Sequence, residues 1–236
     1  ARNLGQLQGR KQFRDYLGYK GDGDGDYYRF DVADKSFLRF SLDDLEPGSQ
    51  IKAEILDKDK QVLPLSHFDG SYGDVTLERG QYYLRLLPEG DTSTNYLLTT
   101  QMAEELGEYT GRHEFENRVV RKDEESYYRF TVGEAGAKDF HLKLKGKDVD
   151  FDLRRDTGGG IVNSELVVPH VFDDGGDLYK RYDYLPAGSY LVRVNLEDDS
   201  RSYGKYDLVM NMDLAGNSLE TARDLGDLSE KRVELE

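Results

Sequence analysis

One stretch of the chain has the residue types and spacing of a divalent-cation site. Asp22, Asp24 and Asp26 alternate with glycines and lead directly into Tyr27-Tyr28-Arg29-Phe30. Glycine lets the backbone fold so that neighbouring carboxylates converge. Ca²⁺ takes roughly six to eight oxygen ligands from carboxylates, carbonyls and water. Without a cation, three clustered carboxylates would repel one another. The pattern therefore predicts a calcium site and leaves open a solvated acidic turn.

Other acidic segments and other calcium motifs are weaker candidates. The loop is not an EF-hand, because the twelfth-position glutamate is missing and a strand follows at once. One Gly-Asp run is also too short for a repeat-in-toxin β-helix. A second acidic loop contains Asp173, Asp174 and Asp177. Clusters of aspartate and glycine are ordinary turn material, so this loop is predicted to be a hairpin tip.

No local signature of catalysis is present. The chain has no cysteine, which excludes disulfides, thiol catalysis, thiolate zinc sites and Fe–S clusters. The four histidines are far apart and show no ligand-like spacing: His67, His113, His141 and His170. No His-Glu-x-x-His, Gly-x-Ser-x-Gly or phosphate-binding loop occurs. We therefore expect a protein that is not an enzyme.

Composition limits the partners and the location. The 236 residues carry a formal net charge of −15, which argues against nucleic acid because phosphate binding needs a basic patch. No run of about 18 or more apolar residues is present, so no membrane span is predicted. A cysteine-free acidic chain fits a secreted bacterial protein, extracellular or at the cell surface, that uses calcium in place of disulfides, and the same composition also fits a cytosolic protein.

The elements that must position the acidic loop belong to a repeated unit. Tyr127-Tyr128-Arg129-Phe130 repeats the first tetrapeptide 100 residues later, and apolar and polar residues alternate in both copies. Several short alternating segments per copy, with turns between them, predict an all-β chain of two tandem antiparallel, jelly-roll-like β-sandwiches. The predicted domains are 1–102 and 103–212. Short helices are expected only around 102–106 and 218–223.

The C-terminal segment begins the unit a third time. Ala222-Arg-Asp-Leu-Gly-Asp-Leu228 repeats Ala1-Arg-Asn-Leu-Gly-Gln-Leu7 with two changes. Residues 213–236 are therefore predicted to be a linker and the truncated start of a third copy.

The ordered set of motifs resembles the bacterial pre-peptidase C-terminal domain family. The motifs are Ala-x-x-Leu-Gly, the acidic loop, Asp26-Tyr-Tyr-Arg-Phe30, Gly80-x-Tyr-Tyr-x-Arg85 and Tyr96-x-Leu98. The resemblance covers 1–212 as two units, and 213–222 resembles the linker and first strand that open such domains. The family is similar in fold to the β-sandwich collagen-binding domains of clostridial collagenases. It implies a non-catalytic accessory domain of secreted proteins, often attached to a peptidase.

The resemblance also implies a ligand set for calcium. In calcium-binding members, the metal lies between an N-terminal linker and the loop that precedes the Tyr-Tyr-x-Phe strand. Asp26 would then be the ligand adjoining the strand, and Asp22 and Asp24 would be loop ligands. Asp213 and Asn217 stand where linker ligands would stand for the third copy.

Two departures from the family pattern bear on this site. The first unit lacks its own Asp-x-Ala-Gly-Asn linker, because the sequence begins at Ala1. The second unit has Ser126 in place of Asp26, with Arg121 and Lys122 in its loop. Calcium is therefore expected in the first unit rather than the second.

Two functional hypotheses follow. The first is a non-catalytic, calcium-stabilised spacer or accessory module of an exported bacterial protein, attached to a peptidase or part of a surface array. The alternative is a module that binds an extracellular polymer, collagen-like or carbohydrate, through outward tyrosines. Tyr27, Tyr83 and Tyr182 are the candidates for that role, because amphipathic rings are common at interfaces. Five tyrosines that recur in the repeat are instead expected in the cores: Tyr28, Tyr82, Tyr96, Tyr190 and Tyr206.

Overall fold

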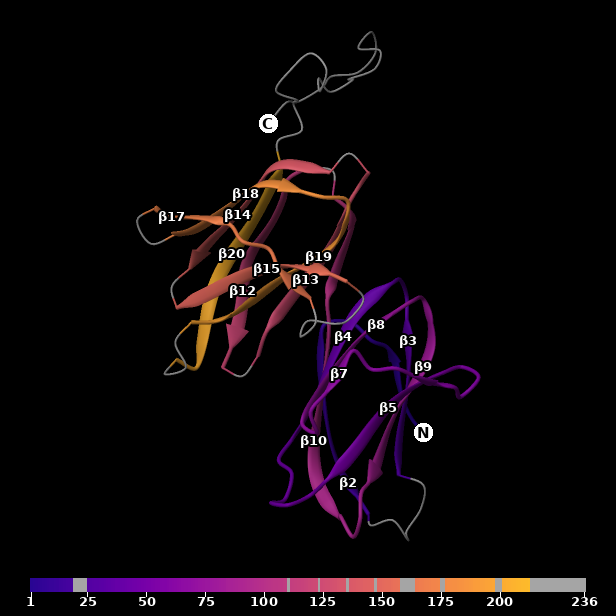
Figure 1. The fold of residues 1–236 in the computed structure, drawn as a ribbon. Coiled ribbons are helices and arrows are strands. Elements are labelled where there is room, and N and C mark those ends of the chain that lie inside the picture. The colour runs from indigo at the N-terminus through magenta and orange to yellow at the C-terminus, as the bar shows by residue number, and fades with distance from the viewer. Residues whose placement is uncertain are drawn as a thin grey trace.

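The fold is known from a computed structural model, which describes most of the chain. The described residues are 1–18, 25–109, 111–122, 124–134, 136–146, 148–157, 164–174, 177–197 and 201–212. They form four five-stranded sheets arranged as two sandwiches, which confirms the predicted all-β class (Figure 1). Within this part of the chain, no helix has the length and apolar character needed to cross a membrane.

The first sandwich consists of ten strands. They are β1 (Arg2–Gln6), β2 (Arg10–Leu17), β3 (Asp26–Val32), β4 (Ser36–Asp43), β5 (Ile51–Asp57), β6 (Val62–Leu63), β7 (His67–Phe68), β8 (Tyr72–Leu77), β9 (Gly80–Pro88) and β10 (Thr94–Met102). One sheet has the order β1-β3-β9-β5-β6 and the other β2-β10-β4-β8-β7.

The second sandwich repeats this arrangement. Its strands are β11 (Glu104–Glu108), β12 (His113–Arg121), β13 (Ser126–Val132), β14 (Ala137–Gly146), β15 (Val149–Asp156), β16 (Glu165–Leu166), β17 (His170–Asp174), β18 (Asp177–Leu185), β19 (Gly188–Leu196) and β20 (Tyr203–Met212). The sheet orders are β11-β13-β19-β15-β16 and β12-β20-β14-β18-β17. The two copies therefore have the same topology, strand for strand.

Each sandwich departs from an antiparallel pattern at one edge. β1 pairs with β3 in parallel, and β11 pairs with β13 in parallel, with a register shift inside each edge strand. The shifts include Gly5 (φ 67°) and Gly107 (φ 71°), where a left-handed backbone favours glycine. The helix predicted for 102–106 is wrong. β10 ends at Met102 and β11 begins at Glu104, because both segments find sheet partners.

Alternation places the cores as predicted. In β3, Tyr28, Phe30 and Val32 are buried, whereas Tyr27 and Arg29 lie on the outer face of the sheet. Each sandwich has its own hydrophobic core, and no residue belongs to both clusters. The five tyrosines expected in the cores are all buried there, which confirms that prediction.

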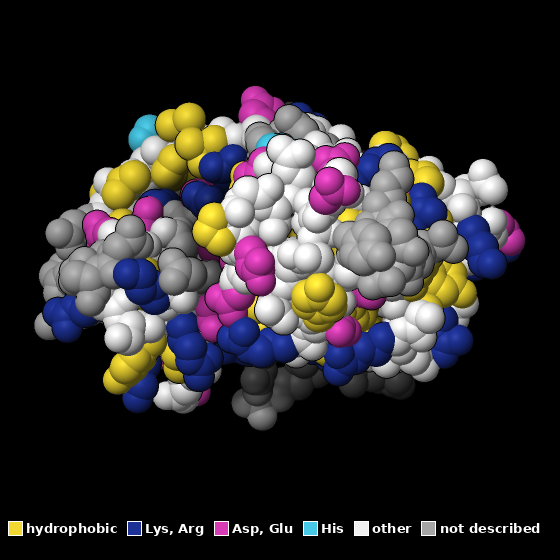
Figure 2. Space-filling model, turned by 90° about the horizontal axis from the view of Figure 1, so that it is seen from below, with side chains coloured by type: hydrophobic (Ala, Val, Ile, Leu, Met, Phe, Trp, Pro, Cys, Tyr) yellow, Lys and Arg dark blue, Asp and Glu magenta, His cyan; other side chains and the backbone are white. Residues whose placement is uncertain are grey.

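The described surface carries both signs of charge. In the view from below, Lys and Arg side chains lie beside Asp and Glu side chains, with apolar side chains scattered between them (Figure 2). Arg14–Asp44 and Lys35–Glu78 are two of the exposed ion pairs. Such pairs are worth little to stability, about 0–1 kcal/mol each.

Candidate functional site

The first candidate feature is a hydrogen-bonded pair of tyrosines next to the predicted calcium loop. Tyr28 on β3 and Tyr96 on β10 meet through their hydroxyls inside the first sandwich. Tyr96 also donates to Oδ2 of Asp26, and Tyr28 donates to Oδ2 of Asp15 at 3.1 Å. The two carboxylates are thus joined by two phenols.

A count of protons shows why this group attracts positive charge. The chain Asp15–Tyr28–Tyr96–Asp26 has three hydrogen bonds, but its two hydroxyls supply only two hydrogens. Burial raises the pKa of Asp26, and the charge of Asp15 raises it further, against the opposing hydrogen bond from Tyr96. The third hydrogen is supplied when Asp26 is protonated. A bound cation would compensate the same charge.

The second sandwich contains the same tyrosine pair without the two carboxylates. Tyr128 and Tyr206 meet at 2.9 Å between hydroxyls. Ser126 begins β13 in the place of Asp26, and the guanidinium of Arg118 lies near the pair and binds Glu104 at 3.2 Å. The corresponding ion pair of the first sandwich, Arg2–Asp15 at 3.7 Å, has its charges exchanged, with the arginine on the first strand and the acid on the second. Only the first pair is therefore flanked by two acids.

The raised pKa of Asp26 leads to a pH prediction. A carboxyl whose folded pKa lies above its ordinary value of 3.8 stabilises the fold when protonated, and this contribution is lost as pH rises through the folded pKa. With a chelator present, the melting temperature should fall as the pH rises from the ordinary pKa of an aspartate, 3.8, through the raised folded pKa of Asp26. Asp26→Asn should remove part of that fall, whereas Asp59→Asn at an exposed carboxylate should not. Equal pH slopes for all three proteins in thermal melts would contradict the assignment.

The second candidate feature is the joint between the sandwiches. Only Ala103 separates the last strand of the first sandwich from the first strand of the second, and its N–H donates to the carbonyl of Phe37 at 2.9 Å. The ring of Phe37 packs edge-on against Tyr127, with ring centroids 5.0 Å apart. Together with Leu191 these residues form a separate buried cluster that belongs to neither sandwich core.

Charged groups surround that cluster. Arg39 on β4 donates to Glu125 and to the hydroxyl of Tyr127, and its guanidinium lies 4.5 Å from the ring centre of Tyr72. Arg193 approaches the same Glu125 at 3.3 Å. Burial alone would lower the pKa of Arg39, but Tyr127 and Glu125 outweigh it and raise the pKa. Burial also raises the pKa of Tyr127 well above its ordinary value. Arg39 therefore stays charged and Tyr127 stays neutral.

A further ion pair crosses the joint. Arg10 on β2 lies 3.0 Å from Glu124, the residue before Glu125. The acidic loop of the second sandwich is thus neutralised by Arg10 and Arg39 from the first sandwich and by Arg193 from its own sheet.

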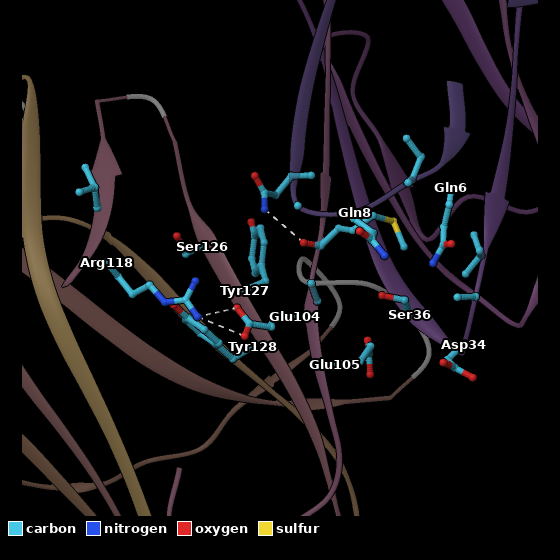
Figure 3. Close-up of a pocket in the computed structure, with 18 of the residues that line it drawn as sticks. Gln6, Gln8, Asp34, Ser36, Glu104, Glu105, Arg118, Ser126, Tyr127 and Tyr128 are labelled. Carbon is cyan, nitrogen blue, oxygen red and sulfur yellow. Dashed lines mark hydrogen bonds and ion pairs between the residues drawn. The ribbon is translucent and has the colours of Figure 1, made fainter. Parts of the chain in front are cut away.

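Two grooves flank the joint, with volumes of about 650 and 680 Å³. Figure 3 shows the first, in which Arg118 points toward Glu104 near Tyr128, and Glu105 lies on the side of Ser36 and Asp34. The residues that line it are mainly amides, carboxylates and hydroxyls, without a histidine or cysteine. This arrangement offers hydrogen-bonding groups to a ligand.

The predicted calcium ligands fall mostly outside the described residues. Asp26 is described, whereas Asp22, Asp24, Asp213 and Asn217 are not. Within the described part, no group of three or more His, Cys, Asp or Glu side chains is arranged to hold a metal ion. The structure therefore describes one predicted ligand, Asp26, whose half-buried carboxylate accepts a hydrogen bond from Tyr96.

The three tyrosines predicted to face outward do not behave alike. Tyr27 and Tyr83 are partly exposed on the outer face of the first sandwich. Tyr182 is only 2% exposed, so its predicted outward position is wrong. It pairs with Phe140 across β14 and β18 and packs against that ring in the core.

Sequence reasoning missed the residues of the joint: Phe37, Arg39, Glu125, Tyr127 and Arg193. One signal was available. Leu38, Phe40 and Leu42 occupy the inward positions of β4, so the apolar Phe37 falls on the outward side. An apolar residue that breaks alternation in this way indicates a second contact surface.

Comparison with known proteins gives likenesses in fold only. No protein-family model matches the sequence, and no curated protein matches it. The pre-peptidase C-terminal domain of a collagenase from Bacillus anthracis is 17% identical over 42% of this chain and 93% of its own length, with a TM-score of 0.35. A putative secreted protein from Eubacterium rectale is 12% identical over 86% of this chain and 73% of its own, with a TM-score of 0.27. At these scores neither match carries a functional argument.

Proposed function

We propose that this chain is a non-catalytic, calcium-stabilised spacer module of an exported bacterial protein, built from domains of the pre-peptidase C-terminal kind. The joint is the observation that supports the spacer role best. One residue connects the sandwiches, and an aromatic cluster with surrounding ion pairs fixes them to each other. A short, buried connection limits relative motion, whereas default inter-domain interfaces are polar and mobile.

Calcium is proposed for the first sandwich only. There the tyrosine pair holds two carboxylates, Asp15 and Asp26, and the adjoining loop adds Asp22 and Asp24 in the sequence. In the second sandwich, arginines neutralise the corresponding loop. A divalent cation held by Asp22, Asp24 and Asp26 would provide the same neutralisation in the first. Asp213 and Asn217 would be the equivalent linker ligands of a third unit.

The chain's own residues would make the cation structural rather than catalytic. Asp26 is tied through Tyr96 and Tyr28 to β2 and β10, so fixing its carboxylate also fixes the loop against both sheets of the sandwich. Bound calcium would supply the positive charge that lets these carboxylates stay ionised together.

A calcium titration followed by thermal melting tests this part of the proposal. Ligand at about 100 times its Kd should stabilise the fold by about 2.7 kcal/mol. Asp24→Ala and Asp26→Asn should abolish the calcium-dependent rise in melting temperature. Asp177→Asn, at the start of β18 in the second sandwich, is the control and should retain it. If saturating Ca²⁺ leaves the parent protein unchanged, the metal role fails.

Polymer binding is the second candidate function. It is favoured by Tyr27 and Tyr83, which are partly exposed on neighbouring strands of one sheet face. Sedimentation with insoluble collagen, cellulose and chitin separates the candidates. A spacer should stay in solution with all three, whereas a polymer-binding module should co-sediment with one and lose that binding in Tyr27→Ala and Tyr83→Ala. The partner would then be an extracellular polymer rather than an attached peptidase domain.

A further inference from the structure

The repeat allows the two sandwiches to be compared position by position. Tyr27 pairs with Arg85 and Arg29 with Tyr83 in the first sandwich, as Tyr127 pairs with Arg193 and Arg129 with Leu191 in the second. These residues lie on the outer face of the β1-β3-β9-β5-β6 sheet and of its counterpart. We call them the outer face of each sandwich.

The outer face of the second sandwich is a docking surface. Phe37 and Arg39 of the first sandwich cover it, and as a result Tyr127 is 2% exposed and Leu191 is fully buried. The equivalent Tyr27 and Tyr83 of the first sandwich are partly exposed, and no described residue from another sandwich covers them.

The uncovered face carries a larger side chain than the covered face at two equivalent positions. Tyr83 stands where the second sandwich has Leu191, and Leu87 stands where it has Asn195. Large aromatic and apolar side chains such as these are more common at the centre of an interface than on a solvated sheet face.

The uncovered face also has an unsatisfied donor. Nε of Arg29 is buried and has no hydrogen-bond partner in the described part of the chain. Its counterpart Arg129 binds Asp156, Glu105 and Ser189. Glu105 itself interacts with Ser36 and Phe37 of the docked sandwich. All three acceptors of Arg129 belong to the second sandwich, and of these Glu105 also contacts the docked first sandwich.

We infer that the outer face of the first sandwich docks a further sandwich unit whose β4-like strand carries an aromatic residue followed, two positions on, by an arginine. The aromatic ring would pack on Tyr27 and Tyr83, as Phe37 packs on Tyr127. In the first sandwich Gly25 stands at the position of Glu125, so this face has no carboxylate there. The arginine of the docking unit would instead bind the Tyr27 hydroxyl and the carboxylate of Glu54, which already pairs with Lys52 and Arg85. This inference rests on the proposed spacer function and extends it to an array.

A three-unit chain tests the inference. A second copy of residues 1–102 is placed directly before Ala1 of the full protein. The Met102 of this added copy is then followed by Ala1, just as Met102 is followed by Ala103 in the parent chain. The protein has no cysteine, so Val62→Cys in both copies of the first unit allows spin labels to report the distance across the new joint. The matched reference is the parent chain with Val62→Cys and Leu166→Cys, because these exposed residues occupy equivalent positions.

The expected result is a narrow distance distribution across the new joint, with the mean of the reference pair. Phe37→Ala with Arg39→Ala in the added copy should broaden it, and so should Tyr27→Ala with Tyr83→Ala in the original copy, which leaves the added copy intact. If the distance distribution is narrow for the reference pair but broad across the new joint without any alanine substitution, the docking inference is overturned and the spacer function is not. A broad reference overturns the spacer function itself. If the distance distribution across the new joint is broad, and the protein also co-sediments with a polymer in a way that depends on Tyr27, the outer face of the first sandwich binds the polymer instead of a further unit.

Discussion

Replacing Phe37 by alanine is expected to lower the free energy of unfolding by about 3 kcal/mol, near the low end of the range for buried phenylalanines. Phe37 is fully buried although it points away from the core of its own sandwich, and its partners are Tyr127, Ala103 and Leu191. The lost contacts are therefore mainly those between the sandwiches. The parent protein should unfold in one calorimetric transition, and Phe37→Ala should separate it into two.

The control for this prediction is an exposed apolar residue. Leu166→Ala removes a side chain that is 52% exposed and should change stability by less than about 0.5 kcal/mol without splitting the transition. If Phe37→Ala lowers the melting temperature but the protein still unfolds in one step, the coupling does not run through this ring.

Replacing Arg129 by alanine is expected to cost about 3–5 kcal/mol, because removing one partner of a buried ion pair leaves an uncompensated charge. Its side chain is 4% exposed, and it lies 3.1 Å from Asp156 and 3.2 Å from Glu105. The side chain of Asp156 is 3% exposed, so water cannot readily replace the guanidinium. Denaturant unfolding followed by circular dichroism measures the loss.

The repeat provides a matched control for Arg129. Arg29 occupies the same position in the first sandwich, but its Nε has no acceptor among the described residues. Arg29→Ala should therefore cost clearly less than Arg129→Ala. Equal losses for the two variants would show that the guanidinium acts through packing of its aliphatic stem rather than through the two carboxylates.

The fold was predictable because strand alternation and the repeat are both local in the sequence. Tyr28 and Phe30 recur as Tyr128 and Phe130, and all four are buried as period-two alternation requires. Tyr182 shows where this reasoning fails. Its segment, Asp177–Leu185, has apolar residues at both alternating sets of positions, Leu178, Tyr182 and Tyr184 on one side and Tyr179 and Leu185 on the other, so alternation alone does not mark the inward side of β18.

The joint was not predictable, since its residues are distant in sequence and unremarkable one by one. Arg39 and Glu125 are 86 positions apart and are ordinary surface residue types. Only the packing of one sandwich against the other brings them together. The predicted short helix at 102–106 failed for the same reason, because sheet partners on both sides draw Met102 and Glu104 into strands.

The rigidity of the joint is tested most directly by ¹⁵N NMR relaxation of the parent chain. If the sandwiches form one rigid spacer, amides in the strands of both should report a single rotational correlation time, that of the whole 27.0 kDa body. In Phe37→Ala that time should shorten and differ between β1–β10 and β11–β20. Separate, shorter correlation times already in the parent protein would contradict the account.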